Sequence, residues 1–220
     1  MLDLKYLQTL IPRLKEKAEL RVFRPPLDVT VELVALDRYG KVEGRRLFRS
    51  HSFLQNFIDI QMYGLFKSTS AQAAIGITGR DINGTYRNIF RGQAFGANAW
   101  QSPSPIATSG AYIVVGTGST AVANADFQLV GQAGQVAATV GDPITVSLTR
   151  SFTLSGAVSL VTQTTINEVG FKMVFGISAQ GGTAATDGNV FLLVRDIVSG
   201  GFVVSAGGSI VVTYTISAAS

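Results

Sequence analysis

Apolar and polar residues alternate along much of this chain with the two-residue period of a β-strand. In residues 28–37 the apolar side chains from Val29 to Ala35 fall on one face and polar side chains fall on the other. Such alternation is typical of a strand with one buried face. Residues 37–40 (DRYG) have the composition of a turn, so residues 41–48 are predicted to return as the second strand of a hairpin.

After residue 109, apolar or alternating runs recur with glycine-rich turns between them. The predicted strands are Ala111–Val115, Phe127–Val130, Ile144–Leu154, Val158–Thr165, Glu168–Phe175, Val190–Val198 and Ile210–Ile216. The predicted turns are residues 116–119, 131–134, 141–143, 181–182, 187–189 and 200–201. Alternation from Ile144 onwards predicts a half-buried strand with one face of hydroxyl side chains. We therefore predict a mainly β fold, an antiparallel β-sandwich of jelly-roll type.

One or two helices are predicted before these strands. Residues 1–20 repeat apolar side chains at helical spacing, with Pro12 either kinking the helix or lying in its first turn. This helix either docks on a neighbour or covers the protein's own sheet. A second helix begins near Ser50 or Ser52 and runs from Phe53 to Phe66, either packed in the core or contacting another subunit.

Charge divides the chain near residue 100. Residues 1–100 hold 15 Lys and Arg against 9 Asp and Glu, whereas residues 101–220 hold 3 against 5. Overall only 15% of residues are charged, compared with about 25% in a typical domain, which leaves little charge to solvate a lone globule. We therefore predict an N-terminal docking region over residues 1–105 (helix, β-hairpin, helix, extended arm) and a β-sandwich domain over residues 106–220, with subunit contacts covering part of the surface.

Composition also excludes several kinds of site. The chain has no Cys and one His, His51, so disulfides, thiolate metal sites, cysteine nucleophiles and multi-histidine metal sites are excluded, and a catalytic triad is disfavoured. The first 20 residues lack a signal-peptide pattern, and no run of about 18 apolar residues predicts a membrane span.

The segment 68–106 lacks periodicity and is predicted to be an arm, partly extended against a partner subunit. Two arginine groups are the candidate nucleic-acid contacts: Arg45, Arg46 and Arg49, and Arg80, Arg87 and Arg91. Acidic residues such as Glu43, Asp59 and Asp81 lie among them, and no nucleic-acid-binding module is recognised, so nucleic acid is an unlikely partner.

Three motifs are better explained by structure than by chemistry. Residues 116–120 (GTGST) lack the lysine and the following helix of a phosphate loop and are read as a turn. Residues 187–189 (DGN) are read as a turn rather than a calcium site, and Arg195-Asp196 as a local or cross-strand ion pair at a sheet edge. Since Glu168, Asp187 and Asp196 have no flanking acid, we predict no enzyme and name no catalytic, cofactor-binding or metal residues.

Several short segments resemble a type of mostly uncharacterised structural protein of tailed bacteriophages and related archaeal viruses. They are YIVVGTG (112–118), DFQL (126–129), residues 149–154, INEVGF (166–171), LLVRD (192–196) and GGSIVVTYTI (207–216), with RRLFRSHSFLQNF (45–57) in the N-terminal half. The resemblance covers about two thirds of the chain. It implies a virion location, a β-sandwich and a role as a capsid decoration or turret protein or a tail-associated protein, with no catalytic residues.

Three hypotheses for the function follow from these observations. The first is a virion structural protein that forms symmetric homo-oligomers and contacts other virion proteins. The alternative is a carbohydrate- or host-receptor-binding module, with Phe95, Trp100 and Tyr112 as candidate aromatic platforms. The third is a glycosidase, which would need a carboxylate pair such as Glu168 and Asp196 that sequence spacing does not support.

Overall fold

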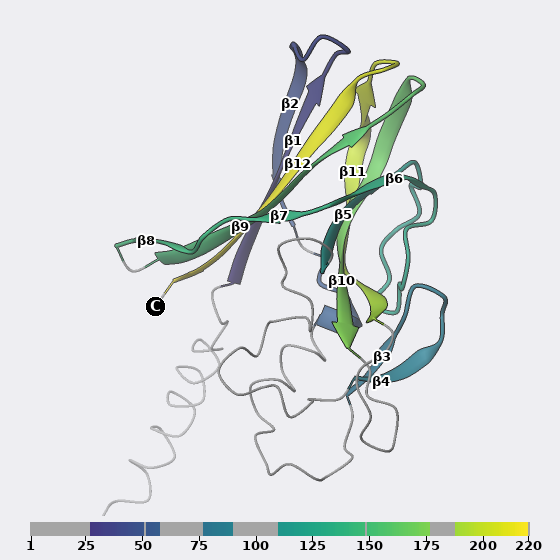
Figure 1. Ribbon diagram of the computed structural model, residues 1–220, viewed down its shortest axis with the longest axis vertical. Coiled ribbons are helices and arrows are strands. Elements are labelled where there is room, and N and C mark those ends of the chain that lie inside the picture. The colour runs from purple at the N-terminus through teal and green to yellow at the C-terminus, as the bar shows by residue number, and fades with distance from the viewer. Residues whose placement is uncertain are drawn as a thin grey trace, which may run out of the picture.

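The computed structural model describes residues 27–50, 52–57, 77–89, 110–147, 149–176 and 188–219. Within these ranges the protein is mainly β, as the sequence predicts, and its strand ladders are antiparallel. The strands form two larger sheets and a separate two-stranded hairpin (Figure 1).

The larger sheet has six strands in the order β2-β1-β12-β9-β7, with β8 also paired to β9. Its strands are β1 (Leu27–Leu36), β2 (Val42–Arg49), β7 (Thr139–Val140), β8 (Ile144–Val146), β9 (Thr149–Ser159) and β12 (Ser209–Ala219). The central strand, β12, is the last in the chain and pairs with β1 over the whole length of β1. The sheet is thus assembled from segments far apart in sequence.

The second sheet has four strands in the order β11-β10-β5-β6. Its strands are β5 (Ala111–Gly116), β6 (Gln132–Ala137), β10 (Thr164–Gly176) and β11 (Gly188–Val204). The separate hairpin consists of β3 (Ile77–Arg80) and β4 (Tyr86–Ile89).

The predicted first hairpin is confirmed as β1 and β2. The Asp37 carboxylate accepts hydrogen bonds from the backbone N–H groups of Tyr39 and Lys41, both at 2.8 Å, and Gly40 takes the left-handed conformation with φ of 81°. Glycine adopts that conformation without a steric penalty, which explains its place in the turn. Although the hairpin falls within the predicted docking region 1–105, it belongs to the six-stranded sheet; the division into two regions itself stays a prediction.

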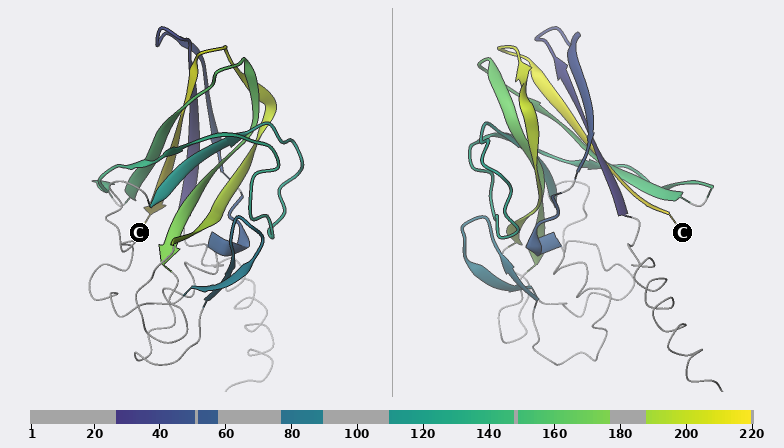
Figure 2. Two further views of the ribbon diagram at one scale, coloured as in Figure 1. Left: turned by 45° about the vertical axis from the view of Figure 1, so that its right-hand side comes forward. Right: turned by 180° about the vertical axis from the view of Figure 1, so that it is seen from behind.

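One hydrophobic core joins the two larger sheets, which face each other (Figure 2). Alternate residues of β1 and β12, among them Leu33 and Val212, point into it from the six-stranded sheet. Ile113, Phe171 and Phe191 enter it from the four-stranded sheet. Among the described residues neither sheet closes on itself, because the first and last strands of each sheet order do not pair with each other.

The region from Phe127 to Gly134 differs from its prediction. Residues 127–130 were expected to be a strand, yet they form a loop in which the Val130 N–H group donates to the Glu168 side chain rather than to a neighbouring strand. Leu129 is buried there against Val114, which accounts for the apolar run. Conversely, residues 131–134 were expected to be a turn but lead directly into β6, which begins at Gln132.

Two further boundaries are wrong. The predicted strand Val158–Thr165 spans the end of β9, a connection at residues 160–163 and the start of β10. The turn expected at residues 200–201 lies inside β11, where four residues stand opposite one residue of β10. Gly200 and Gly201 have positive φ of 74° and 69°, so they form a bulge that the strand passes through rather than its end.

The strand predicted from Ile144 to Leu154 is divided in two. Ser147 has a φ of 53°, and the chain reverses there so that β8 pairs with the beginning of β9. The expectation of half burial is wrong for β8, since its three residues are exposed and Ile144 and Val146 are 61% and 69% accessible. The β8–β9 hairpin projects from the body of the protein beside the C-terminal end of β12 (Figure 1).

The predicted helices lie mostly outside the described residues. Residues 1–20 are not described, and of the second helix only Gln55–Phe57 is seen as helical, while Phe53 forms a bridge with Val194 of β11. Within the predicted arm 68–106, residues 77–89 form the β3–β4 hairpin against this chain's own residues, because the Ile82 N–H group donates to the Val190 carbonyl. The rest of that arm, and its contact with a partner subunit, stay predictions.

Candidate functional site

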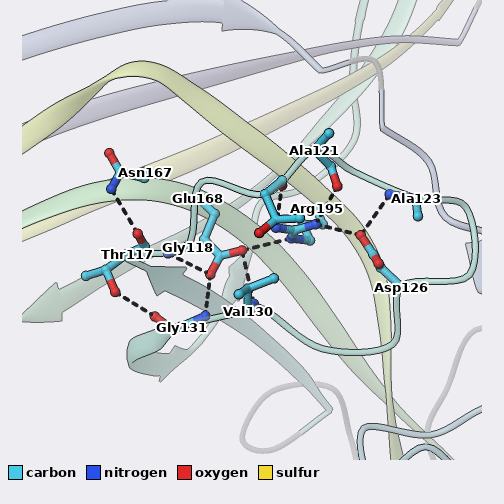
Figure 3. A network of polar contacts seen from close by, with 11 residues as sticks. Thr117, Gly118, Ala121, Ala123, Asp126, Val130, Gly131, Asn167, Glu168 and Arg195 are labelled. Atoms are coloured by element: carbon cyan, nitrogen blue, oxygen red, sulfur yellow. Dashed lines mark hydrogen bonds and ion pairs between the residues drawn. The ribbon is translucent and has the colours of Figure 1, made fainter.

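The outer side of the four-stranded sheet is covered by the chain's own residues 117–131. Under this loop lies Glu168 of β10, whose side chain has no solvent exposure. Its carboxylate accepts hydrogen bonds from the N–H groups of Gly118 (3.2 Å), Val130 (3.2 Å) and Gly131 (2.8 Å) (Figure 3). A buried carboxylate is tolerated when donors replace its water. Glu168 therefore ties both ends of the loop to β10.

Arg195 of β11 completes this arrangement. Its Nε donates to Glu168 Oε2 at 2.8 Å, its Nη1 donates to Asp126 Oδ2 at 2.6 Å, and its Nη2 donates to the Thr120 carbonyl at 2.9 Å. Burial alone lowers the pKa of Arg195, but the hydrogen bonds and charges of Glu168 and Asp126 outweigh it and raise that pKa. The guanidinium therefore stays charged. We call Asp126, Glu168 and Arg195 the loop clamp.

The loop clamp bears on two predictions. The sequence predicts a local or cross-strand ion pair at a sheet edge for Arg195-Asp196; in the structure Arg195 lies on the edge strand β11 and pairs across the sheet with Glu168 of β10, and it also pairs with Asp126. Residues 116–120 form a connection, as predicted, and Gly118 has a definite role there. A Cβ on Gly118 would lie 2.6 Å from Glu168 Oε1, so only glycine permits this approach.

Sequence reasoning did not find the loop clamp, although one signal for it existed. The half of the chain after residue 100 holds only three basic and five acidic residues. An acid and an arginine in apolar strands of such a region, Glu168 and Arg195, must find partners because unpaired buried charges are costly. The pattern shows that pairing is needed, but it does not show which residues pair.

A second layer covers the same side of this sheet. The Asn56 side chain donates to the Arg80 and Leu192 carbonyls at 2.9 and 3.2 Å and accepts from the Arg80 N–H group at 2.9 Å. The Arg80 guanidinium lies 4.0 Å from the centroid of the Phe127 ring. These contacts hold the β3–β4 hairpin against β11 and the clamped loop.

Lys172 is the one buried amine in this region of the described chain. It lies on β10 with 4% exposure, and its ammonium donates to the Gln132 side-chain carbonyl. Burial lowers the pKa of Lys172 because the charged form is desolvated. The Gln132 side chain is a neutral amide, so the charge of Lys172 is held less favourably than that of Arg195.

A further polar cluster lies at the end of the core. The Ser50 hydroxyl donates to Asp196 Oδ1 at 3.0 Å, and the fully buried Tyr214 lies nearby. Burial, and then the negative charge of Asp196, raise the pKa of Tyr214 well above its usual value. A shallow cleft of about 460 Å³ opens beside Asp196, between Phe48, Ser52 and the loop at Ser119.

The outer side of the six-stranded sheet has a different character. Because side chains alternate, the residues next to the buried ones along β9 and β12 point outward. They are Thr149, Ser151, Thr153, Ser155, Ala157 and Ser159 on β9, and Ser209, Val211, Thr213, Thr215 and Ser217 on β12. Neither set contains a charged or aromatic residue. The register extends this surface to Thr139 of β7 and to Ile144 and Val146 of β8. We call this surface, together with the outward residues of β1 and β2, the hydroxyl face.

Charged side chains occur on the hydroxyl face only along β1 and β2. Arg45 is paired with Glu32, and Arg49 lies 3.5 Å from Asp28. The side chains of the two arginines are 72% and 68% exposed, so these ion pairs are at the surface and contribute little stability. The charges of one edge are thus balanced within the chain, while β7, β8, β9 and β12 present a neutral surface.

The edges of this sheet are better protected from pairing than its face. β7 and β8 have two and three residues, too short to template another strand, and β2 carries Arg45, Arg46 and Arg49. Short and charged edges are common ways to prevent strand addition. Over β7, β8, β9 and β12 the face lacks such protection, since a solvated sheet face ordinarily carries Lys, Arg, Glu or Asp.

The other candidate residues do not gather into a site. Tyr112 is half-buried on β5 opposite Lys172, while Phe95 and Trp100 lie outside the described residues. His51, Asp187 and Arg91 are also outside, and the side chain of Arg87 is not described. Arg45, Arg46 and Arg49 lie on one strand, and Arg80 lies on the separate hairpin. Glu168 is occupied in the loop clamp and Asp196 in the core.

Comparison with known proteins and a search for metal-binding groups point to no other functional site among the described residues. No family model, curated protein or solved structure matches this chain. In the ranges that the structure describes, no group of three or more His, Cys, Asp or Glu side chains is arranged to hold a metal ion. The same ranges contain no helix whose length and apolar character suit a membrane crossing. The hydroxyl face is therefore the strongest candidate site.

Proposed function

We propose that this protein is a structural component of a virus particle, associated with the capsid as a decoration or turret protein or with the tail, and that it works as a homo-oligomer. The viral location is supported by the resemblance of segments such as residues 112–118 and 207–216 to virion proteins. The role in assembly is supported by the hydroxyl face. Contacts with other virion proteins complete the proposed role.

The observation that carries the proposal is the absence of charge from the outward positions of β9 and β12. These two strands contribute eleven side chains to the hydroxyl face, all of them Ser, Thr, Ala or Val. Short neutral side chains lose little conformational entropy and little hydration when another protein covers them. A lone soluble domain gains solubility from charge at such positions, so its absence favours a covered surface.

The finer fold belongs to the same proposal. Two antiparallel sheets that share one core support a β-sandwich of jelly-roll type. The hydroxyl face would then be the outer side of one layer, and the loop clamp would close the outer side of the other.

A structural role rather than catalysis also suits the ionisable groups that are described. Glu168 and Arg195 bind the loop and each other, and Asp196 accepts a hydrogen bond from Ser50 in the core. Each of these groups is buried and stabilises the fold. The proposal therefore assigns no catalytic residue.

Two measurements test the proposal. Native mass spectrometry of the full chain at micromolar concentration is expected to show a defined oligomer. A density map of purified particles is expected to place copies of the chain at symmetry-related positions on the capsid or tail. A monomer that is also absent from particles would overturn the proposal.

The alternative, a carbohydrate- or receptor-binding module, makes a different prediction. No aromatic side chain lies on the hydroxyl face, whereas ligand sites are usually concave and lined by apolar and aromatic side chains. A glycan array is therefore expected to give no signal with the chain. A strong signal that is lost in a Tyr112→Ala variant would favour the alternative.

A further inference from the structure

We propose that the hydroxyl face binds the same face of a second copy, with a two-fold axis running along β12. This inference rests on the proposed function, because it names the partner and the geometry of the oligomer. β12 is the central strand of the order β2-β1-β12-β9-β7, so an axis along it covers the sheet most completely.

A second copy is the partner that the chemistry of the face fits. In a two-fold interface the same patch meets itself, so groups on the axis meet their own kind and groups off the axis meet the residue at the opposite end of their row. A hydroxyl group both donates and accepts a hydrogen bond, and it therefore complements another hydroxyl. Along the axis, Thr213, Thr215 and Ser217 would meet the same residues of the partner without like charges coming together.

The positions of the charged residues allow two directions of the two-fold axis to be compared, along β12 and across the strands. The pairing register defines rows across the sheet: Leu47, Glu32, Thr213, Ser155 and Thr139 form one row, and Asp28, Ser217, Ser151 and Ile144 form another. An axis along β12 keeps each row and exchanges its two ends. Each β1 carboxylate then faces a serine of the partner's β9.

An axis across the strands can bring like charges together. Placed at the row that contains Arg49, Thr30, Thr215 and Thr153, it reverses the other rows about that row. Arg49 would then lie over the same residue of the second copy, and Asp28 would lie over Glu32. Like charges brought together at a partly desolvated interface oppose binding. The axis along β12 brings no like charges together and is therefore favoured over an axis at that row.

The size of the face is sufficient for such a dimer. The five strands in the sheet order, β2, β1, β12, β9 and β7, together contain 42 residues. With about 3.3 Å per residue along a strand and about 4.8 Å between strands, the area of the face is about 650 Å² per copy. The total of about 1,300 Å² falls within the range of stable interfaces, which begins at about 1,200 Å².

Cysteine cross-linking tests the geometry, because the chain has no native cysteine. Leu47 and Thr139 lie at opposite ends of one row and are both exposed. Single variants Leu47→Cys and Thr139→Cys are mixed, dissociated, reassociated and treated with a short bis-maleimide. The inference predicts a Leu47–Thr139 cross-link between copies at a yield at least tenfold above that of either variant alone.

The control is Ala133→Cys, which places a thiol on an exposed position of β6 in the other sheet. It is expected not to cross-link with itself or with Leu47→Cys. Like-with-like cross-links at Leu47 and Thr139, or of an Arg49→Cys variant with itself, would mean an axis across the strands and would overturn the inference. An intact oligomer that cross-links only through Ala133 would overturn it too, while leaving the proposed function standing. A protein that is monomeric and absent from particles would overturn both this inference and the proposed function.

Discussion

The two sheets of this protein present their outer sides in opposite ways. The four-stranded sheet carries charged residues on its outer side, Glu168, Lys172 and Arg195, and all three are buried, Glu168 and Arg195 beneath residues 117–131. The six-stranded sheet is neutral over β9 and β12, and its outer positions there are partly or fully exposed. On the four-stranded sheet, Glu168 and Arg195 mark where the chain binds its own loop. On the six-stranded sheet, exposed charges are confined to β1 and β2, and the neutral positions of β9 and β12 mark where we propose that the chain meets another copy.

Breaking the loop clamp should have the largest effect. Arg195→Met leaves the Glu168 and Asp126 carboxylates without their cation, and removal of one partner of a buried ion pair typically costs about 3–5 kcal/mol. Urea unfolding should show that loss, and amide exchange should accelerate at Gly118, Val130 and Gly131. The exposed Arg150→Met is the control and should change stability by less than about 0.5 kcal/mol. A similar small change for Arg195→Met would contradict the role given to the clamp.

Charging the hydroxyl face should affect association instead of folding. The double variant Val211→Lys/Thr215→Lys places two cations on β12, where each would meet the same residue of the second copy, and like charges brought together in an interface oppose binding. Self-association measured by analytical ultracentrifugation should weaken at least tenfold, with the monomer's urea midpoint nearly unchanged. Ala133→Lys and Gln135→Lys on β6 are matched controls and should leave the oligomer intact. If the lysine variants on β6 weakened self-association as much as the double variant on the hydroxyl face, the two sheets would not differ in their role in association.

The Tyr214 cluster predicts a pH dependence. The pKa of Tyr214 is raised in the folded state by burial and by Asp196, so its stabilising contribution is complete below the unfolded pKa of about 10 and is lost as pH rises towards the folded value. Between pH 9 and pH 11 the wild type should lose about 1 kcal/mol more than Tyr214→Phe. Parallel urea titrations of the two proteins would measure this. Identical slopes would show that Tyr214 does not retain its proton.

Replacement of the buried amine should have the smallest effect. Lys172 contacts a neutral amide, and burial lowers its pKa because the charge is desolvated. Lys172→Met keeps the length of the side chain and removes that cost, so stability at pH 7 should rise by about 0.5 kcal/mol. The exposed Lys41→Met should show no gain. A clear loss in Lys172→Met would mean that the Gln132 contact outweighs desolvation.

The strands were the most predictable part of the fold, and apolar covering loops were the least. β1, β5, β10 and β12 follow from alternation or apolar runs, which report one buried face directly. Phe127–Val130 has the same kind of pattern but is a loop, because Leu129 is buried on the outside of a sheet and Val130 is held by Glu168. A hydrophobic pattern shows that side chains are buried, but it does not show against which part of the protein they pack.

The candidate site shows the same limit. The low charge and the hydroxyl side chains of residues 149–159 and 209–219 are visible in the sequence, and they indicated a surface with an unusual environment. That Thr215 lies beside Thr30 and Thr153 depends on pairing between segments more than 60 residues apart. The loop clamp likewise depends on Asp126, Glu168 and Arg195 meeting across 69 residues.

By itself the sequence determined the mainly β, antiparallel character of the protein, its first hairpin and the neutrality of its C-terminal half, because these are properties of local pattern and composition. Only the tertiary structure decided that β12 lies at the centre of a sheet, that the scarce charges are buried together, and that the neutral positions form one face. The physical reason is that strand order and charge pairing are set by long-range contacts, each of which depends on where the rest of the chain has already packed.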